Sequence, residues 1–330
     1  MFRTSTNNHG AHLAPGRVVP WWFDMAGRRP DNPLVAGALL GSIEAGGTKW
    51  VCAVGSGPDE IVAETRIPTT SPSETLGEVL EFFSRYPAMQ AMGIASFGPL
   101  ELRPSHPKFG FITSTPKVGW SDTDLVGVLE EGFDIPIGID TDVNGAALAE
   151  GTWGAAVGFT SYVYLTVGTG VGGGAVLNGK TIRGLVHPEM GHVSVRRHPD
   201  DGFPGLCPYH GDCFEGLASG PAIVARWGDE PRNLAPAVRI SAAEMEAHYV
   251  AEGLRNIVFV LAPELIIVGG GASNIEGFLP AVRSRLQESL ADYPGLPEHA
   301  EASFVVAPGL GERSGVAGGF ILATGALTAR

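Results

Sequence analysis

Two stretches of this chain repeat the same layout, in which a glycine turn joins two apolar runs. In the first, Gly46 and Gly47 separate SIEA from the run TKWVCAV, and in the second, GTG at 168–170 separates YVYLTV from VGGGAVL. Each stretch is typical of two strands joined by a tight turn. The recurrence indicates a duplicated domain core, and the 330 residues are enough for two ordinary domains.

The composition is that of a compact α/β protein and not of a disordered one. Hydrophobic residues make up 44% of the chain, and 47 glycines supply many turns. The 22 basic and 35 acidic residues leave a formal net charge of −13, whose field repels nucleic acids and anionic membranes. We therefore expect neither as a partner, although local dipoles can still bind a small anion such as ATP.

The cysteines and the N-terminus indicate a cytoplasmic protein. Three cysteines, Cys52, Cys207 and Cys213, cannot form a disulfide framework, which favours a reducing compartment. We find no apolar run long enough for a membrane helix, and VVPWWF near the N-terminus is too short for a signal-peptide core. Residues 1–40 follow neither a helical nor a strand period, so we predict a poorly ordered extension before a first domain that begins at Gly41.

Helix signals with defined starts follow the first turn and recur near the C-terminus. The sequence SPSE at 71–74 is a capping box with proline at the first helical position, which predicts a helix. SAAE at 241–244 predicts the start of a long helix through Leu261. Residues 264–271 predict a buried strand and a glycine loop, followed by a helix, a strand and a Gly/Ala-rich final helix.

Asp142 is the candidate catalytic residue. IPIGID at 135–140 predicts a strand that runs into a helix, so Asp142 lies at the carboxyl end of a strand, where open α/β sheets bind their ligands. The alternative is that Asp142 is only the N-cap of that helix. Asp140 is interpreted as a strand-end charge.

Two glycine patterns match nucleotide-binding motifs in the wrong structural context. GAVLNGKT at 174–181 fits a P-loop, but Asn-Gly within it is a strong hairpin signal and no helical period follows. Gly168, Gly170 and Gly173 match the dinucleotide fingerprint, also without a following helix. We instead interpret the two glycine turns as places where bare backbone N–H groups approach phosphate; the alternative is a glycine turn with no ligand.

The segment 187–215 combines soft metal ligands with two carboxylates, Glu189 and Glu215. Its candidate ligands are His192, Cys207, His210 and Cys213. This is the donor set of a tetrahedral zinc ion, and four protein ligands close the coordination sphere, so we predict a structural zinc site. The alternative is a buried thiol pair with surface imidazoles. The residues predicted to lie in loops or on the surface are His187, His198, Arg196 and Arg197, and Cys52 is predicted to lie in the core.

A series of motifs runs in one order through residues 41–325. They are IEAGGTK (43–49), SFGP (96–99), TDVNGAALAE (141–150), TVGTGVGGG (166–174), HPEMGH (187–192), CPYHGDCFEG (207–216), SGPA (219–222) and IIVGGG (266–271). With these motifs the chain resembles the ROK sugar kinases of the actin-like ATPase superfamily, and in particular their fructokinase-like branch. The resemblance implies two actin-like, ribonuclease H-like α/β lobes around a central cleft. Residues 41–150 would form the N-terminal lobe and 151–330 the C-terminal lobe with the zinc loop 187–215.

The resemblance also implies a set of site residues. The two glycine turns would hold the ATP phosphates from opposite lobes, with Mg²⁺ across them, and the late glycine loop would lie against adenosine. The residues assigned to ATP in this way are Gly46, Gly47, Thr48, Lys49, Gly168, Thr169, Gly170, Pro221, Gly269, Gly270 and Gly271. Asp142 would be the general base, and the sugar would contact Thr141, Asp142, Glu189, His192 and Glu215. His192 would offer one ring nitrogen to zinc and the other to the sugar.

Two departures from the family bear on the substrate. Thr141 stands where glucose-specific members carry Asn, and Glu44 where many relatives carry Asp. Loss of the amide donor favours fructose, so we expect a homodimeric kinase that converts ATP and D-fructose to ADP and D-fructose 6-phosphate. The alternatives are a hexose kinase that prefers mannose or glucose and a non-catalytic, sugar-sensing regulator. Such regulators carry a helix-turn-helix ahead of the core, which the Pro-broken residues 1–40 cannot supply.

Overall fold

The first of two sheets is built from the N-terminal part of the chain. The computed structural model describes residues 37–271, 275 and 277–329. The strands of this sheet are β1 (Leu40–Ala45), β2 (Lys49–Gly55), β3 (Ile61–Pro68), β4 (Ala91–Ser96) and β7 (Ile137–Thr141). Their order is β3-β2-β1-β4-β7, in which β1 to β3 form an antiparallel meander and β4 and β7 run parallel to β1.

The second sheet repeats this order. Its strands are β8 (Tyr162–Val167), β9 (Val171–Leu177), β10 (Lys180–Thr181), β11 (Leu265–Gly269) and β12 (Val305–Val306). The order is β10-β9-β8-β11-β12, again a meander followed by two parallel strands. The two sheets match strand for strand, which confirms the predicted duplication. A small hairpin of β5 (Phe111–Ile112) and β6 (Thr123–Asp124) is attached to the first lobe.

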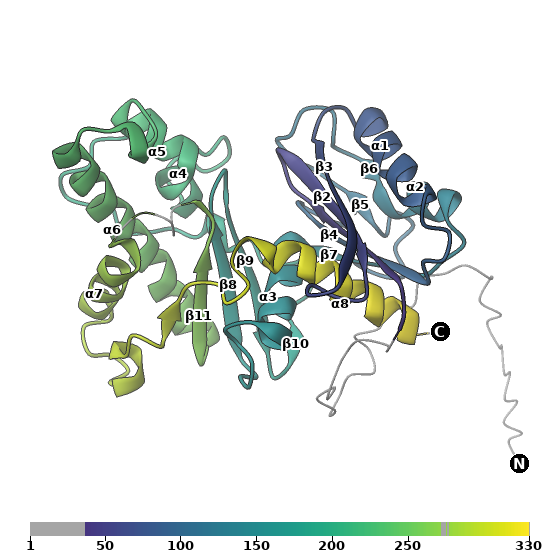
Figure 1. Ribbon diagram of the computed structural model, residues 1–330. Coiled ribbons are helices and arrows are strands. Elements are labelled where there is room, and N and C mark those ends of the chain that lie inside the picture. Colours follow the sequence, from purple (N-terminus) through teal and green to yellow (C-terminus); the bar gives the residue numbers. More distant parts are fainter. Residues whose placement is uncertain (1–36, 272–274, 276, 330) are drawn as a thin grey trace, which may run out of the picture.

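Two helices, α1 (Pro72–Ser84) and α2 (Leu125–Gly132), cover one face of the first sheet (Figure 1). α1 begins with the predicted capping box, in which the Glu74 N–H donates to Ser71 Oγ and the Ser71 N–H donates to the Glu74 carboxylate. Its apolar face buries Val79 and Phe83 against the sheet. The cap and the apolar spacing are both local, which explains why the sequence predicted this helix correctly.

The second sheet is covered by α4 (Phe214–Ala218), α6 (Pro236–Leu261) and α7 (Phe278–Leu290), with α5 (Gly220–Trp227) beside them. α6 ends at the predicted Leu261 but starts at Pro236, ahead of the predicted cap at 241–244. Proline at the first helical position is already fixed at a helical φ, and Ser241 inside the helix donates instead to Ala237 O at 3.4 Å. The 3₁₀ turns are η2 (Met190–His192), η3 (Pro231–Asn233), η5 (Pro297–Ala300) and η6 (Gly311–Arg313).

Two further helices, α3 (Asp142–Trp153) and α8 (Ser314–Thr328), each pack on the sheet of the other repeat. α3 follows the first sheet but packs mainly on β8 and β9, whereas α8 follows the second sheet and packs on β1, β4 and β7 (Figure 1). The helices touch at Gly145 and Gly318, where a Cβ on Gly318 would lie 2.3 Å from the Gly145 backbone. α8 thus covers the first sheet although it lies within residues 151–330, which were predicted to form the C-terminal lobe, and α3 packs on the second sheet although it lies mostly within residues 41–150.

Glu150, near the end of α3, fastens both connections between the lobes. Its carboxylate is fully buried and accepts hydrogen bonds from the backbone N–H groups of Ala155 (2.7 Å), Gly309 (2.9 Å) and Leu310 (3.1 Å) and from the Ser314 hydroxyl (2.7 Å). The chain enters the second lobe at Ala155 and returns from it through 309–314. One carboxylate therefore holds the two crossings together.

The turn at Asn178 and Gly179 is a hairpin turn and not a P-loop. Both residues have positive φ, 51° and 75°, and they join β9 to β10. The turn after β8 likewise leads into strand β9, so neither nucleotide motif is followed by the helix it requires. Both motif matches were therefore correctly set aside.

The N-terminal boundary lies slightly earlier than predicted. Ala38 is 2% exposed and β1 begins at Leu40, so these residues belong to the first lobe rather than to the extension predicted for 1–40. The rest of that prediction falls on residues 1–36, outside the described residues. Among the helices of the described ranges, none combines the length and apolar character needed to cross a membrane.

Candidate active site and metal centre

Asp142 is the first residue of α3. The N-cap is Thr141, whose hydroxyl oxygen accepts the Asn144 N–H at 3.2 Å, so the alternative of Asp142 as the N-cap is wrong. Asp142 Oδ1 accepts the Val143 N–H at 2.9 Å. Burial raises the pKa of Asp142 to about 6; the charge of Asp140 adds to the rise and the bond from Val143 opposes it. A carboxyl group with this pKa is ionised at pH 7 and can still accept a proton.

Asp140 is more than a strand-end charge. It is fully buried at the end of β7 and pairs with the Arg183 guanidinium. Its Oδ1 also accepts from Asn144 Nδ2 at 2.9 Å and from the Thr141 N–H at 2.7 Å. A buried charge requires such partners, and here they fix the β7–α3 junction that carries Asp142. No sequence motif marks this role, because Arg183 lies 43 residues away along the chain.

Two more carboxyl groups lie near Asp142. Burial raises the pKa of Glu44 in β1 to about 7, where the charge of Asp142 adds to the rise and Lys49 opposes it. Burial, followed by the charges of Glu215 and Asp142, raises the pKa of Glu189 to about 7, although 43% of its side chain is exposed. The charge of Asp142 raises the pKa of both Glu44 and Glu189. The end of β1 and the predicted sugar loop therefore both lie near the start of α3.

The two glycine turns lie at the carboxyl ends of β1 and β8. In the first, the Gly46 N–H donates to Lys49 O at 3.0 Å, and a Cβ on Gly46 would lie 2.7 Å from that oxygen. In the second, the Gly168 N–H donates to Gly170 O at 2.9 Å, and Gly168 O accepts the Gly220 N–H at 2.7 Å, which joins the turn to the start of α5. The structure therefore places the predicted phosphate-binding turns in equivalent positions of the two lobes.

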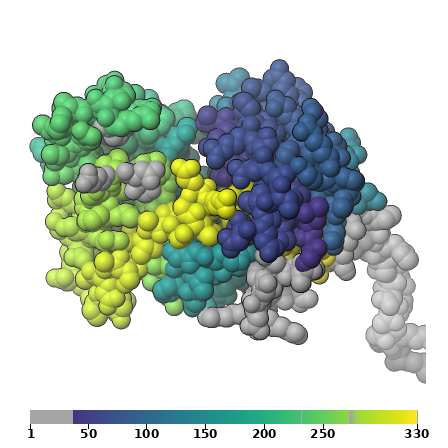
Figure 2. Space-filling view, in the orientation of Figure 1, coloured from purple at the N-terminus to yellow at the C-terminus, as the bar shows by residue number. Residues whose placement is uncertain are grey.

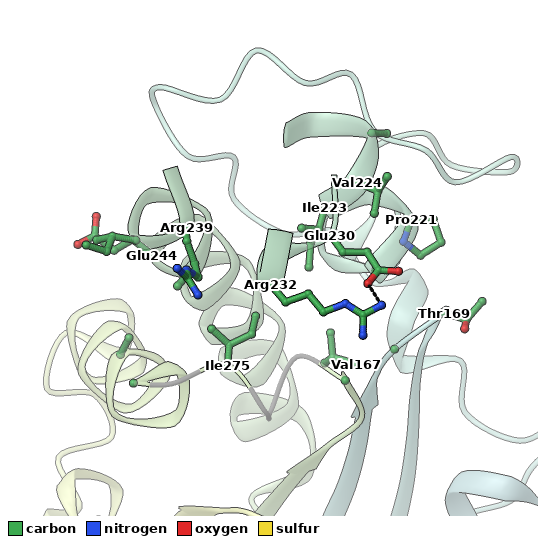
Figure 3. Close-up of a pocket in the computed structure, with 18 of the residues that line it drawn as sticks. Val167, Thr169, Pro221, Ile223, Val224, Glu230, Arg232, Arg239, Glu244 and Ile275 are labelled. Atoms are coloured by element: carbon green, nitrogen blue, oxygen red, sulfur yellow. Dashed lines mark ion pairs between the residues drawn. The ribbon is translucent and has the colours of Figure 1, made fainter. Parts of the chain in front are cut away.

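A cavity of 1510 Å³ opens beside the second turn (Figure 3). Of the residues predicted to bind ATP, those that line it are Gly168, Thr169, Pro221 and Gly271. The first turn does not line it. Gly270 has a φ of +85°, and a Cβ there would lie 2.4 Å from Val167 O, so the late glycine loop packs directly against the end of β8.

Charged side chains that no motif predicts also line this cavity. They are Glu230, Arg232, Arg239 and Glu244, and Glu230 and Arg232 form an ion pair of 2.5 Å (Figure 3). The glycine motifs predicted the backbone wall of the cavity. The opposite wall follows no fixed spacing, which explains why its residues were missed.

The predicted zinc ligands come together. The donor atoms of His192, Cys207, His210 and Cys213 all lie within 4.8 Å of one another. His192 Nδ1 is 3.5 Å from Cys213 Sγ and 3.7 Å from Cys207 Sγ, and Cys207 Sγ is 3.8 Å from His210 Nδ1. Ideal bond lengths around tetrahedral zinc put neighbouring N and S ligands about 3.6 Å apart. The donor set therefore fits a zinc ion, whose binding stays a prediction.

The same loop positions the two predicted sugar-binding carboxylates. Cys213 is the N-cap of α4 and Glu215 lies in its first turn, where Glu215 Oε2 accepts the Val171 N–H at 3.0 Å. Glu189 precedes η2, which ends at His192. Each carboxylate thus lies within three residues of a candidate ligand, so an ion would hold both segments.

His187 lies in a loop, as the sequence suggested, but it is buried and not on the surface. It is 6% exposed, and its Nε2 accepts the backbone N–H of Leu100, in the first lobe, at 3.0 Å. Burial lowers the pKa of His187 and so favours the neutral ring. The hydrogen bond from Leu100 to His187 therefore joins the two lobes. The molecular surface is hollowed between these lobes above α8 (Figure 2).

The comparisons with known proteins agree with this geometry. The sequence profile of the ROK family matches residues 40–326. A protein of Zymomonas mobilis named fructokinase is 47% identical over 295 residues, 87% of this chain and 97% of its own length. A fructokinase of Pediococcus pentosaceus is 41% identical over 289 residues, 88% of this chain and 99% of its own. The crystal structure of a ROK hexokinase from Thermus thermophilus superimposes with a TM-score of 0.71 at 28% identity, covering 86% of this chain and 97% of that one.

Proposed function

The chain belongs to the ROK family, and we propose that it is an ATP-dependent fructokinase with Asp142 as its general base. The reaction transfers the γ-phosphoryl group of ATP to D-fructose and yields ADP and D-fructose 6-phosphate. The relatives named fructokinase, at 41–47% identity over most of the chain, support the activity. The observation that supports Asp142 as the base is its position at the start of α3, where burial raises the pKa of its carboxyl group to about 6.

In this proposal the two carboxylate oxygens of Asp142 have different tasks. Oδ1 accepts the Val143 N–H and is thereby oriented, so Oδ2 is the oxygen that accepts the proton of the attacking sugar hydroxyl. Phosphoryl transfer needs chiefly positioning and charge stabilisation, and general-base catalysis typically adds about 10²–10⁴-fold. The bonds from Asn144 and Thr141 to Asp140 keep the junction rigid and the base in place.

ATP would bind between the two glycine turns. The cavity beside Gly168 and Thr169 is large enough for a nucleoside, and Pro221 and Gly271 line it. Turn Gly46–Lys49 would meet the phosphates from the first lobe through backbone N–H groups, with Lys49 as a cation. Mg²⁺ carried on the phosphates supplies charge neutralisation.

The sugar would bind opposite Asp142, against the loop that carries the metal cluster. Glu189 and Glu215 would accept hydrogen bonds from sugar hydroxyls. His192 turns Nδ1 toward the two cysteines, so its Nε2–H would donate to the sugar. Glu189 lies close enough to Asp142 and Glu215 for their charges to raise its pKa. Thr141 is 3% exposed and caps α3, so its part in sugar choice is indirect. The metal's task would be structural, since four protein ligands leave no open coordination position.

An assay of ADP release over fructose, mannose, glucose and N-acetylated hexosamines tests the proposal. We expect the highest kcat/KM on fructose. A higher value on mannose or glucose would replace the fructokinase by another hexose kinase. Zinc-loaded protein that binds a sugar without releasing ADP would instead be a sugar-sensing regulator, and the kinase would be ruled out.

We further propose a cytoplasmic homodimer. Cys52, Cys207 and Cys213 are all unpaired, which fits a reducing compartment, and the net charge of −13 opposes nucleic acid and anionic lipid as partners. Light scattering on the purified protein measures the assembly: a mass twice that of the 34.4 kDa chain is expected, and a monomer would contradict it.

A further inference from the structure

The segment of residues 182–189, here named the crossing segment, leaves the second sheet after β10 and makes two buried polar contacts with the first lobe. The Arg183 guanidinium pairs with Asp140 at the end of β7, where Arg183 has 13% and Asp140 0% of its side chain exposed. The His187 ring accepts the N–H of Leu100 in the loop after β4. Although the crossing segment belongs to the second lobe in sequence, it is therefore bonded to the first lobe, whose strand β7 leads into Asp142.

The bond from Leu100 fixes the protonation of the His187 ring. A backbone N–H only donates, so Nε2 must be the unprotonated acceptor and the ring proton lies on Nδ1. Nδ1 faces Glu189 Oε1 at 3.4 Å and the Pro188 carbonyl oxygen at 3.5 Å. The ring N–H thus bonds the Pro188 carbonyl oxygen and lies beside the Glu189 carboxylate, while the other ring nitrogen is held by the first lobe.

The first lobe leaves room for this contact. A Cβ on Gly98 would lie 3.2 Å from His187 Nε2 and 3.0 Å from the Leu100 N, which is tighter than ordinary contact. With glycine there, the ring reaches the Leu100 N–H without obstruction. Leu100 itself is 3% exposed, so water does not compete for the bond.

We propose that His187 is a positioning residue that fixes Glu189 against the first lobe and thereby sets the affinity for sugar. This inference rests on the proposed function, in which Glu189 binds sugar hydroxyls. The contacts of Arg183 with Asp140 and of His187 with Leu100 thus fix Glu189 relative to Asp142, whereas neither residue lines the cavity proposed for ATP. His187 therefore acts on the sugar and not on ATP.

Kinetics of His187 variants test this separation. His187→Ala removes both contacts, and we expect the KM for fructose to rise about tenfold while the KM for ATP stays within about twofold. His187→Gln retains an acceptor for the Leu100 N–H, and His187→Asn retains a donor toward Glu189. Because each keeps one contact, each should recover part of the fructose affinity. The matched control is His248→Gln, which changes a half-buried histidine bonded to the Arg196 carbonyl on the far side of the metal loop, and it should leave both KM values unchanged.

Calorimetric titration of the same proteins with fructose separates the two hypotheses. If the wild-type protein binds no fructose, the proposed function fails. If the wild-type protein binds fructose and His187→Ala binds it within twofold as tightly, the positioning role is wrong. Equal rises in the two KM values in all three variants would also overturn it, because a general loss of structure affects both substrates.

Discussion

The starts of α3 and α8 occupy equivalent places in two copies of one topology, yet they do different work. Each helix follows the last parallel strand of its repeat and crosses to the other repeat's sheet. α3 starts with Asp142, a half-buried carboxyl group with a raised pKa, whereas α8 starts with Ser314, which donates to Glu150. Duplication therefore supplied the frame twice, and the proposed chemistry needs only one copy.

The connections between strands differ in the same sense. In the first repeat, residues 69–90 between β3 and β4 contain one helix, α1. In the second repeat, residues 182–264 between β10 and β11 contain the crossing segment, the four candidate zinc ligands, α4 to α6 and most of the cavity lining. The first repeat contributes the proposed base, and the enlarged connection of the second repeat contributes surfaces proposed to bind both substrates.

The largest expected effect is on the base. Asp142→Asn keeps the shape of the side chain but removes the proton acceptor, so kcat should fall by about 10²–10⁴-fold with the fold retained. The matched control is Asp124→Asn at the start of α2, where the side chain caps a helix by accepting the Gly127 N–H at 2.7 Å. A folded Asp142→Asn protein with nearly normal kcat would show that the start of α3 has no catalytic role and in this respect does not differ from the start of α8.

The next effect concerns the connection between the repeats. In Glu150→Gln an amide NH₂ replaces one of two accepting oxygens and faces a buried N–H or hydroxyl, so we expect a loss of about 1.5–3 kcal/mol in the free energy of unfolding. Ser314→Ala removes one neutral donor and should cost about 1 kcal/mol. Urea denaturation measures both. A Ser314→Ala loss equal to that of Glu150→Gln would mean that the hydroxyl, and not the carboxylate, fastens the crossings.

Loss of the metal should affect the second lobe's function selectively. Cys213→Ala removes a predicted ligand directly before α4, so the protein should lose zinc and bind fructose at least about tenfold more weakly. Cys52→Ala changes a buried cysteine in the first sheet and should keep the metal and the sugar affinity. Metal analysis and calorimetry measure the two quantities. Full fructose affinity in a metal-free Cys213→Ala protein would break the proposed coupling.

The smallest effect appears on acidification. Because the proposed base must be ionised to act and its pKa in the free protein is about 6, kcat/KM for fructose should fall toward a tenth at pH 5 and approach its plateau above pH 7. The sign for stability is opposite. A folded-state pKa above the ordinary 3.8 means that protonation stabilises the fold below about pH 4, and that this stabilisation is lost as pH rises through 6. Asp142→Asn lacks the loss, so its stability relative to wild type should grow between pH 4 and 7. The same difference in stability between Asp142→Asn and wild type at pH 4 and at pH 7 would contradict the raised pKa of Asp142.

Local patterns predicted much of this molecule. The glycine turns after β1 and β8, the cap at Ser71 and the hairpin at Asn178 depend on neighbouring residues alone, and the structure confirms them. The four candidate zinc ligands lie within 22 residues, which made their meeting predictable from spacing.

Contacts between distant segments were not predictable in this way. His187 depends on Leu100, 87 residues away, and nothing in its own neighbourhood distinguishes it from a surface histidine. The sequence also did not indicate that α8 covers the first sheet. Nearly every residue of that helix is buried, so its sequence has no polar face to indicate which sheet it covers.

The exchange of α3 and α8 also constrains how the chain is made. A ribosome releases β1, β4 and β7 well before the helix that covers one face of these strands, which occupies residues 314–328. That face carries buried apolar residues such as Leu40 and Ala91 in contact with Val316 and Phe320. During translation the N-terminal sheet therefore keeps an apolar face uncovered until α8 has been synthesised, and a stop codon before α8 would leave the first sheet without its covering helix.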